Sequence, residues 1–149
     1  MLTIHAADEV RYDWDGAALK DGAVVVEGGR LAAVGAQADL RDRFPTARVR
    51  TWAGVLGPAR VHDGPLPAAP SPRERVHEVL KRGATAVLER YADSPGLRTA
   101  AERNDVAVLR GTAGTPALVE AGRADLAVFD ETGACIATVC AGRLVHRRT

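Results

Sequence analysis

The sequence predicts an α+β fold in which hairpins from both ends of the chain form one sheet or sandwich around a small α/β insert. Near the N-terminus, a Gly28-Gly29 pair separates two apolar runs, a pattern typical of a tight β-hairpin. In the middle, the sequence Ser71-Pro72-Arg73-Glu74 marks a helix start after a segment rich in Gly and Pro. The C-terminal part then returns to short apolar runs divided by turn residues.

The N-terminal third is expected to be mostly strand. The hairpin around Gly28-Gly29 places Glu27 opposite Arg30, because glycines supply the positive φ angles of a two-residue turn. Pro45 ends a short helical run, after which polar and apolar residues alternate. The predicted strands cover residues 2–6, 23–27, 30–34 and 48–52, and the predicted helix covers residues 38–44.

The middle of the chain is predicted to be a loop at residues 54–72 followed by a βαβ unit. The loop is expected because Gly and Pro recur throughout it. The helix that starts at Ser71-Pro72 has an apolar face, and Gly83 suits its end. A buried strand at residues 84–88, a second helix opened by Ser94-Pro95 and a strand at residues 106–109 complete the unit, whose strands are expected to be parallel.

Three further strands are predicted at residues 124–129, 135–140 and 143–146, with turns between them. Short terminal strand sets rarely hold a fold alone, so the N- and C-terminal hairpins are expected to pack on each other. The chain therefore reads as a single domain over residues 1–149, with β-rich parts at 1–53 and 115–149 and an α/β insert at 72–111.

Composition excludes several classes of protein. The chain has 149 residues, 46% of them hydrophobic, and a formal net charge of +1, which argues against a nucleic-acid partner. It has no apolar run long enough to span a bilayer and no signal-like N-terminus, so we expect a cytoplasmic protein without a membrane partner. Cys135 and Cys140 are expected to be reduced core residues, with a reactive thiol as the alternative.

Several segments resemble the amidohydrolase superfamily, and its imidazolonepropionase-like members most. Residues 22–35 are similar to the opening hairpin of that family, residues 121–130 to its closing Ala-Asp-Leu motif, and residues 139–145 to its final strand pair. The resemblance implies a composite β-domain assembled from both chain ends around a TIM barrel. Residues 81–87 resemble a second barrel strand, but the rest of the middle is too short for eight strands, so the βαβ unit is interpreted as the remnant of a truncated barrel.

The resemblance also implies that the family's metal ligands are missing. Residues 55–66 are similar to the first barrel strand, in which two histidines hold the metal, and those two positions are Gly64 and Leu66 here. Neither side chain can bind a metal. We therefore expect no cofactor and a non-catalytic amidohydrolase-like domain, a pseudoenzyme that works as a binding or assembly subunit.

The alternative is a hydrolase acting on carbon–nitrogen bonds other than peptide bonds, with an atypical or shared metal such as zinc. Its candidate residues are His62 and Asp63, for catalysis or metal binding, and His77 as a further ligand, with Asp93 nearby. The plainer interpretation is that His62 and Asp63 are turn residues and that His77 is solvated on a helix flank.

Other features have a structural and a functional interpretation. His5 is expected to be a hydrogen-bonded strand histidine. Asp125 is expected to orient the turn before its strand, as the resemblance implies. Residues 111–115 are either a flexible connection or an anion cradle, and the basic C-terminal residues are either solvated or a weak anion site.

Partners are expected because the strands left by a truncated barrel lack neighbours. A homodimer, a hetero-complex or a separate chain supplying the missing parts would cover the barrel-side sheet face, and a small-molecule ligand is also possible.

Overall fold

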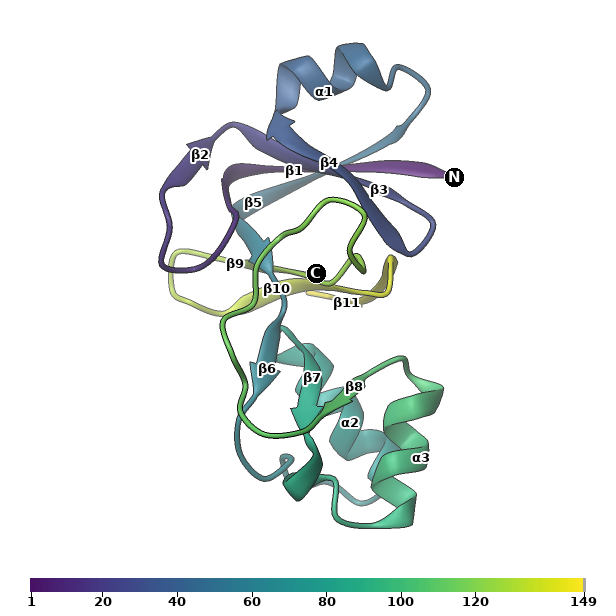
Figure 1. Ribbon diagram of the computed structural model, residues 1–149. Helices are drawn as coiled ribbons and strands as arrows, with labels where there is room; N and C mark the ends of the chain where they lie inside the picture. Colours follow the sequence, from purple (N-terminus) through teal and green to yellow (C-terminus); the bar gives the residue numbers. More distant parts are fainter. Residues whose placement is uncertain (149) are drawn as a thin grey trace.

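The computed structural model describes residues 1–148, which form two units, one above the other in Figure 1. The larger unit is a mixed β-sheet, and the smaller unit is a three-stranded parallel sheet with two helices. Within the described residues there are three α-helices, and the third, α1 (Gln37–Arg43), packs on the larger sheet. The predicted combination of a large sheet and a small α/β insert is therefore confirmed.

The larger sheet is built from both ends of the chain. Over residues 1–148 it has eight strands in the order β11-β10-β9-β5-β1-β3-β4, with β2 paired to β1 outside this order. Strand β5 joins the two halves, because it pairs in parallel with β1 and antiparallel with β9. Its strands are β1 (Leu2–Arg11), β2 (Ala18–Lys20), β3 (Gly22–Glu27), β4 (Arg30–Ala36), β5 (Arg48–Pro58), β9 (Leu126–Phe129), β10 (Cys135–Cys140) and β11 (Arg143–Arg147).

The sheet curls until its two halves meet. The amide of Leu31, in β4, donates to the carbonyl of Gly122, just before β9, over 2.9 Å. Leu31 and Val26 from the N-terminal half share one buried cluster with Val139 from the C-terminal half. The two halves thus bury their apolar faces against each other, as expected for a sheet that folds on itself.

The predicted hairpin is present, with a different turn geometry. Glu27 pairs with Arg30 as expected. Gly28 adopts a φ of 59°, but Gly29 has no positive φ. A Cβ at Gly29 would lie 3.3 Å from the carbonyl oxygen of Ala141, so the second glycine is explained by close packing against the β10–β11 turn.

The prediction of a loop at residues 54–72 is wrong for its first part, which the structure shows as strand. Strand β5 continues through Gly54 and Gly57 to Pro58, and a further strand, β6 (Arg60–His62), follows at once. A Cβ at Gly54 would lie 2.4 Å from the carbonyl oxygen of Phe129, and one at Gly57 would lie 2.6 Å from the ring of Trp14. These glycines therefore permit close approach of neighbouring groups within a continuing strand.

The smaller unit has the predicted βαβ connectivity with parallel strands. Ser71 accepts a hydrogen bond from the amide of Glu74, and Ser94 accepts one from the amide of Leu97, so both predicted helix caps are confirmed. Its elements are β6, α2 (Pro72–Lys81), β7 (Ala84–Leu88), the 3₁₀ turn η1 (Glu89–Tyr91), α3 (Pro95–Arg103) and β8 (Ala107–Leu109).

Buried contacts attach the smaller unit to the larger sheet. The hydroxyl of Thr138, in β10, donates to the carbonyl of Leu80, in α2, over 2.7 Å. The amide of Ala59, between β5 and β6, donates to the carbonyl of Asp125, just before β9, over 3.0 Å. Cys140 belongs to the same buried cluster as the helices α2 and α3. The core of the α/β unit is therefore completed by β10.

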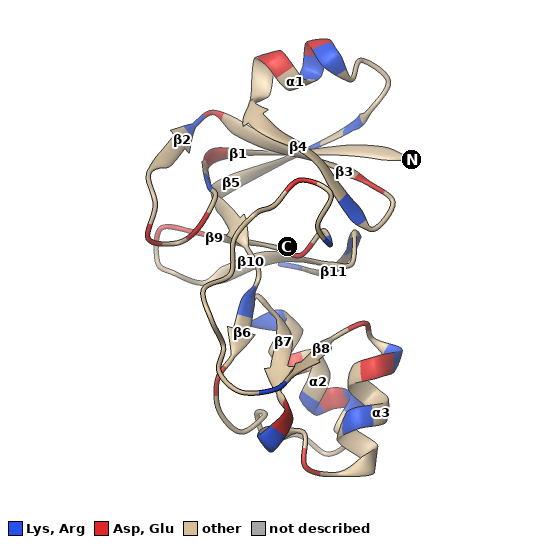
Figure 2. Cartoon of the chain, in the orientation of Figure 1, with Lys and Arg blue, Asp and Glu red and all other residues tan. Residues whose placement is uncertain are grey.

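Positively and negatively charged residues are interspersed along both units (Figure 2). Across residues 1–148, no helix combines the length and the apolar character that crossing a membrane requires.

Candidate functional site

Two of the predicted metal or acid–base residues, His62 and Asp63, lie at one end of the smaller sheet. His62 is the last residue of β6, and its Nε2 lies 2.9 Å from the carbonyl oxygen of Pro65. Asp63 is exposed and forms an ion pair with Arg90, with 3.5 Å between the carboxylate and guanidinium atoms. His62 thus contacts a nearby backbone carbonyl and Asp63 an exposed arginine, as polar residues in turns commonly do.

His77 and Asp93 lie elsewhere. His77 is exposed on α2, and Asp93 immediately precedes the Ser94 cap of α3. Among residues 1–148, no three His, Cys, Asp or Glu side chains gather closely enough to hold a metal ion. The four candidate residues therefore form no group of three metal ligands within this part of the chain.

The two positions that resemble the family's metal ligands do not fit a metal. Gly64 has no side chain, and the space around its Cα is open. Leu66 is 4% exposed and packs in the apolar cluster of Val76, Val79 and Val87. A buried leucine offers no donor atom and surrounds the position with hydrocarbon, whereas zinc requires nitrogen, oxygen or sulfur donors.

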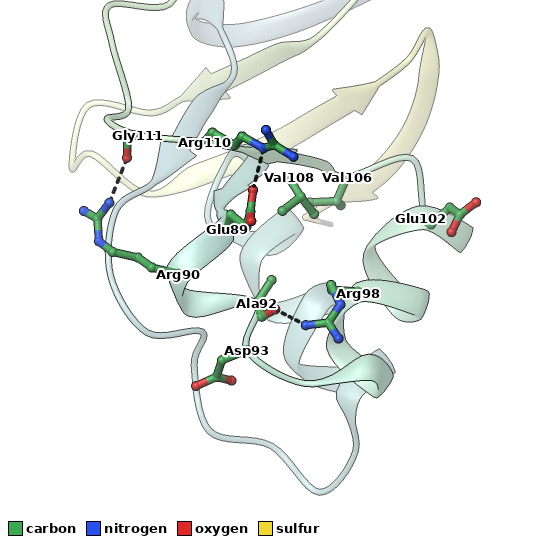
Figure 3. Close-up of a pocket in the computed structure, with 10 residues that line it drawn as sticks. All are labelled: Glu89, Arg90, Ala92, Asp93, Arg98, Glu102, Val106, Val108, Arg110 and Gly111. Carbon is green, nitrogen blue, oxygen red and sulfur yellow. Dashed lines mark hydrogen bonds and ion pairs between the residues drawn. The ribbon is translucent and has the colours of Figure 1, made fainter.

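An open hollow of about 980 Å³ lies between α3 and β8 (Figure 3). Val106 and Val108 line it from the β8 side, and Arg98 and Glu102 line it from α3, where they are one helical turn apart. The remaining lining residues come from the turn after β7 and the end of β8: Glu89, Arg90, Ala92, Asp93, Arg110 and Gly111.

The charges of the hollow are balanced. Three arginines face three carboxylates among its lining residues, and Arg110 pairs with Glu89 over 3.1 Å. Arg98 donates to the carbonyl of Ala92 over 3.2 Å. As far as the described residues go, the lining contains no hydroxyl, thiol or imidazole group, so it has no nucleophile–base pair.

A narrower cleft of about 410 Å³ separates the larger sheet from the smaller one. The predicted glycine-rich segment borders it through Ala113, Gly114 and Thr115. The carbonyl oxygen of Gly111, at the start of the segment, accepts a hydrogen bond from Arg90 over 2.7 Å. This oxygen is therefore engaged with a cation. The segment serves as a cover over the face of the smaller sheet opposite to its helices.

A polar network that the sequence did not reveal joins the two units around Arg123. Its guanidinium pairs with Asp125 over 2.8 Å and donates to the carbonyl of Asp105, in the turn before β8. Burial opposes the charge of Arg123, but the hydrogen bond and the charge of Asp125 outweigh it and raise the pKa of Arg123. Asp125 also accepts from the amide of Ala141 over 3.0 Å. Asp125 thus pairs with Arg123 in the turn before its own strand, where it was predicted to act. Its contact with Ala141 lies in another turn, between β10 and β11, and was not predicted.

The remaining titratable candidates are structural. His5 is 2% exposed, and its Nδ1 lies 3.2 Å from Nε1 of Trp52, as expected for a hydrogen-bonded strand histidine. Burial, and secondarily the charge of Arg50, lowers the pKa of His5 to about 4. Cys135 and Cys140 are free thiols. Burial raises the pKa of Cys140 to about 11, so the thiolate that a nucleophile requires is disfavoured.

Comparison with known protein families gives one match, within the larger sheet. Residues 22–47 match the model of the imidazolonepropionase-like composite domain of bacteria. This match covers β3, β4 and α1, and together with the structural likeness below it supports an imidazolonepropionase-like composite domain. A search of curated protein sequences finds no match.

Solved structures show the same fold over most of this chain. Guanine deaminase from E. coli aligns with 75% of the chain at 15% identity and a TM-score of 0.55. An adenosine deaminase from Xanthomonas campestris with bound zinc aligns with 72% at 21% identity and a TM-score of 0.54. Ochratoxinase from A. niger aligns with 73% at 19% identity and a TM-score of 0.51. The aligned part amounts to 36%, 33% and 30% of these proteins, so the chain spans about a third of their length.

Proposed function

We propose that this chain, an imidazolonepropionase-like composite domain joined to a small βαβ unit, is a non-catalytic binding or assembly subunit. One observation carries the proposal. The two positions that resemble the family's metal-binding histidines are an open glycine, Gly64, and a buried leucine, Leu66. In amidohydrolase chemistry the metal both activates water and polarises the substrate, and neither function has a donor set at these positions.

The structure offers surfaces for binding in place of chemistry. The hollow between α3 and β8 has an apolar floor and a charged rim, the combination found at protein interfaces. The smaller sheet ends at β8, which pairs only with β7 among the described strands. We infer that a homodimer or a hetero-complex covers this region, and that the narrower cleft is the place for a small-molecule ligand.

Metal analysis tests the non-catalytic assignment. Protein purified without chelator is expected to contain no stoichiometric zinc, iron or manganese, because the ligand positions lack donor atoms. Its melting temperature is expected to be the same in EDTA and in equimolar zinc. A stoichiometric metal together with hydrolysis of carbon–nitrogen substrates would contradict the proposal.

The alternative is a carbon–nitrogen hydrolase that uses an atypical or shared zinc site, and the position of His62 and Asp63 at the carboxyl end of β6 favours it. In this case the double variant H62A/D63N would lose metal and activity together. The matched variant H77A, on the exposed face of α2, separates a role of His77 as a ligand from a solvated histidine.

A further inference from the structure

We propose that the hollow between α3 and β8 binds a second copy of this chain, with the two β8 strands paired antiparallel about a two-fold axis. The inference rests on the proposed assembly function and deepens it by naming the partner and the contact. Three features support it: the free edge of β8, the distance expected between the two α3 helices, and the opposite charges along α3.

The edge of β8 is open on the side away from β7. Ala107, Val108 and Leu109 pair with β7 through one side of the strand. Val108 is one of the few large apolar residues with substantial exposure, at 36%. An unpaired edge with an exposed valine readily accepts another strand. The opposite face of the smaller sheet is bordered by residues 113–118, so the open surface is on the side of the helices.

The spacing of the layers leaves room for one helix beside α3. Helix α3 connects β7 to β8 and contacts β8 and α2. A two-fold axis perpendicular to the sheet and beside β8 keeps both α3 helices on the same face. For helices centred over the gap between β7 and β8, as a βαβ crossover places them, the two axes would be two strand spacings apart, about 9.5 Å. Helices pack at about 8–10 Å. The second helix therefore fills the hollow, and its side chains cover Val106 and Val108.

The charges on α3 are self-complementary in this arrangement. Arg98 and Glu102 both line the hollow and lie one turn apart on α3. In Figure 3, Arg98 reaches towards Ala92 and Glu102 points outward. An antiparallel second α3 places its Glu102 against Arg98 and its Arg98 against Glu102. A parallel copy would bring like charges together. The balanced charge of the whole rim also favours an identical partner over a strongly acidic or basic one.

A two-fold contact through β8 also limits the assembly to a dimer. The contact uses the same edge on both copies, so it is closed and does not continue into a fibre. The remaining edge of the smaller sheet, at β6, follows directly from β5 through Ala59 and is held close to the larger sheet.

Charge reversal on α3 tests the contact. Sedimentation velocity over a range of concentrations is expected to show a monomer–dimer equilibrium for the wild type. R98E places Glu against Glu102 twice and is expected to raise the dissociation constant at least about tenfold. The double variant R98E/E102R restores opposite charges and is expected to recover dimerisation, which a loss of folding would not do.

Val108 provides an independent test with a matched control. V108K is expected to abolish the dimer because lysine blocks strand addition at an edge. V119K is at a valine that is 60% exposed and whose neighbours Leu118 and Ala121 bond to Tyr12 and Leu31 of the larger unit, so it is expected to leave the dimer unchanged. V108C is expected to form a disulfide-linked dimer under mild oxidation, since position 108 lies near the axis, whereas V119C is not.

The outcomes distinguish this inference from the proposed function. A wild-type protein that stays monomeric at all concentrations overturns the dimer, and the metal analysis then decides the function separately. A dimer that is insensitive to R98E and V108K overturns the β8 contact while assembly stands. Binding of an unlike protein at the hollow in place of a second copy would likewise overturn it.

Discussion

At the residue scale, protonation of the buried His5 is expected to affect the stability of the fold. Its Nδ1 accepts a hydrogen bond from Trp52, and a protonated ring would set one donor against another. Arg50, which is paired with His5 across β1 and β5, adds positive charge nearby. The folded protein therefore holds the neutral imidazole, whereas the unfolded chain binds a proton near pH 6.5.

This difference predicts that stability declines in acid. The contribution of His5 is fully present above about pH 6.5 and is lost as the pH falls towards about 4, because only the unfolded chain gains a proton in this window. The loss amounts to at most about 3 kcal/mol in the free energy of unfolding. Urea denaturation at several pH values measures it. H5Q is expected to have a flatter pH dependence, and H77Q, on an exposed helix face, is expected to retain the wild-type slope. Equal slopes in H5Q and wild type would refute this.

Asp125 is the second residue with a measurable role. D125A removes the acceptor of both Arg123 and the amide of Ala141. It is expected to lower the free energy of unfolding by about 1–2 kcal/mol, since the pair is partly exposed and solvent replaces some of the interaction. D125N keeps an oxygen for the Ala141 amide and is expected to lose less. Chemical denaturation compares them with E131A, at an exposed residue, which is expected to be neutral. A loss in D125N equal to that in D125A would exclude a role for the Ala141 contact.

At the element scale, helix starts that depend on neighbouring residues could be predicted from the sequence. Glycines that are required by contact with a distant segment could not. Ser71 and Ser94 cap their helices through atoms three residues away, so the sequence alone indicates both helix starts. Gly54 indicates a break in the sequence, yet β5 continues there because Phe129, distant in the chain, occupies the place of its side chain. In the sequence, a glycine that ends a strand cannot be distinguished from one that allows another segment to pack closely against a continuing strand.

The candidate site shows the same division. The resemblance of residues 55–66 to a barrel strand located the missing ligand positions, and the structure shows why Leu66 cannot serve, because it is buried among valines. The hollow between α3 and β8 was not foreseen. Arg98 and Glu102 were its only local signal, and an opposite-charge pair four residues apart on a helix ordinarily indicates a solvated face.

At the scale of the whole molecule, the two units depend on each other. The helices α2 and α3 share a buried cluster with Cys140 of β10, so separating the units would expose apolar surface on both. In the larger sheet, β9 pairs with β5, and β5 leads directly into β6 of the smaller unit. We therefore expect the described chain to unfold as one cooperative unit, with the contacts between β10 and α2 as part of the common core.

The hydrogen bond from Thr138 to Leu80 tests this coupling. Thr138 is fully buried, and T138V keeps its shape while removing the hydroxyl that reaches α2. The expected loss is about 1 kcal/mol in the free energy of unfolding. It stays small because the amide of Gly83 still donates to the same carbonyl. Hydrogen exchange is expected to accelerate in α2 as well as in β10, since the contact joins them. T132V, at an exposed threonine in the β9–β10 turn, is the matched control and is expected to leave exchange in α2 unchanged. Acceleration confined to β10 in T138V would show that the two units open independently.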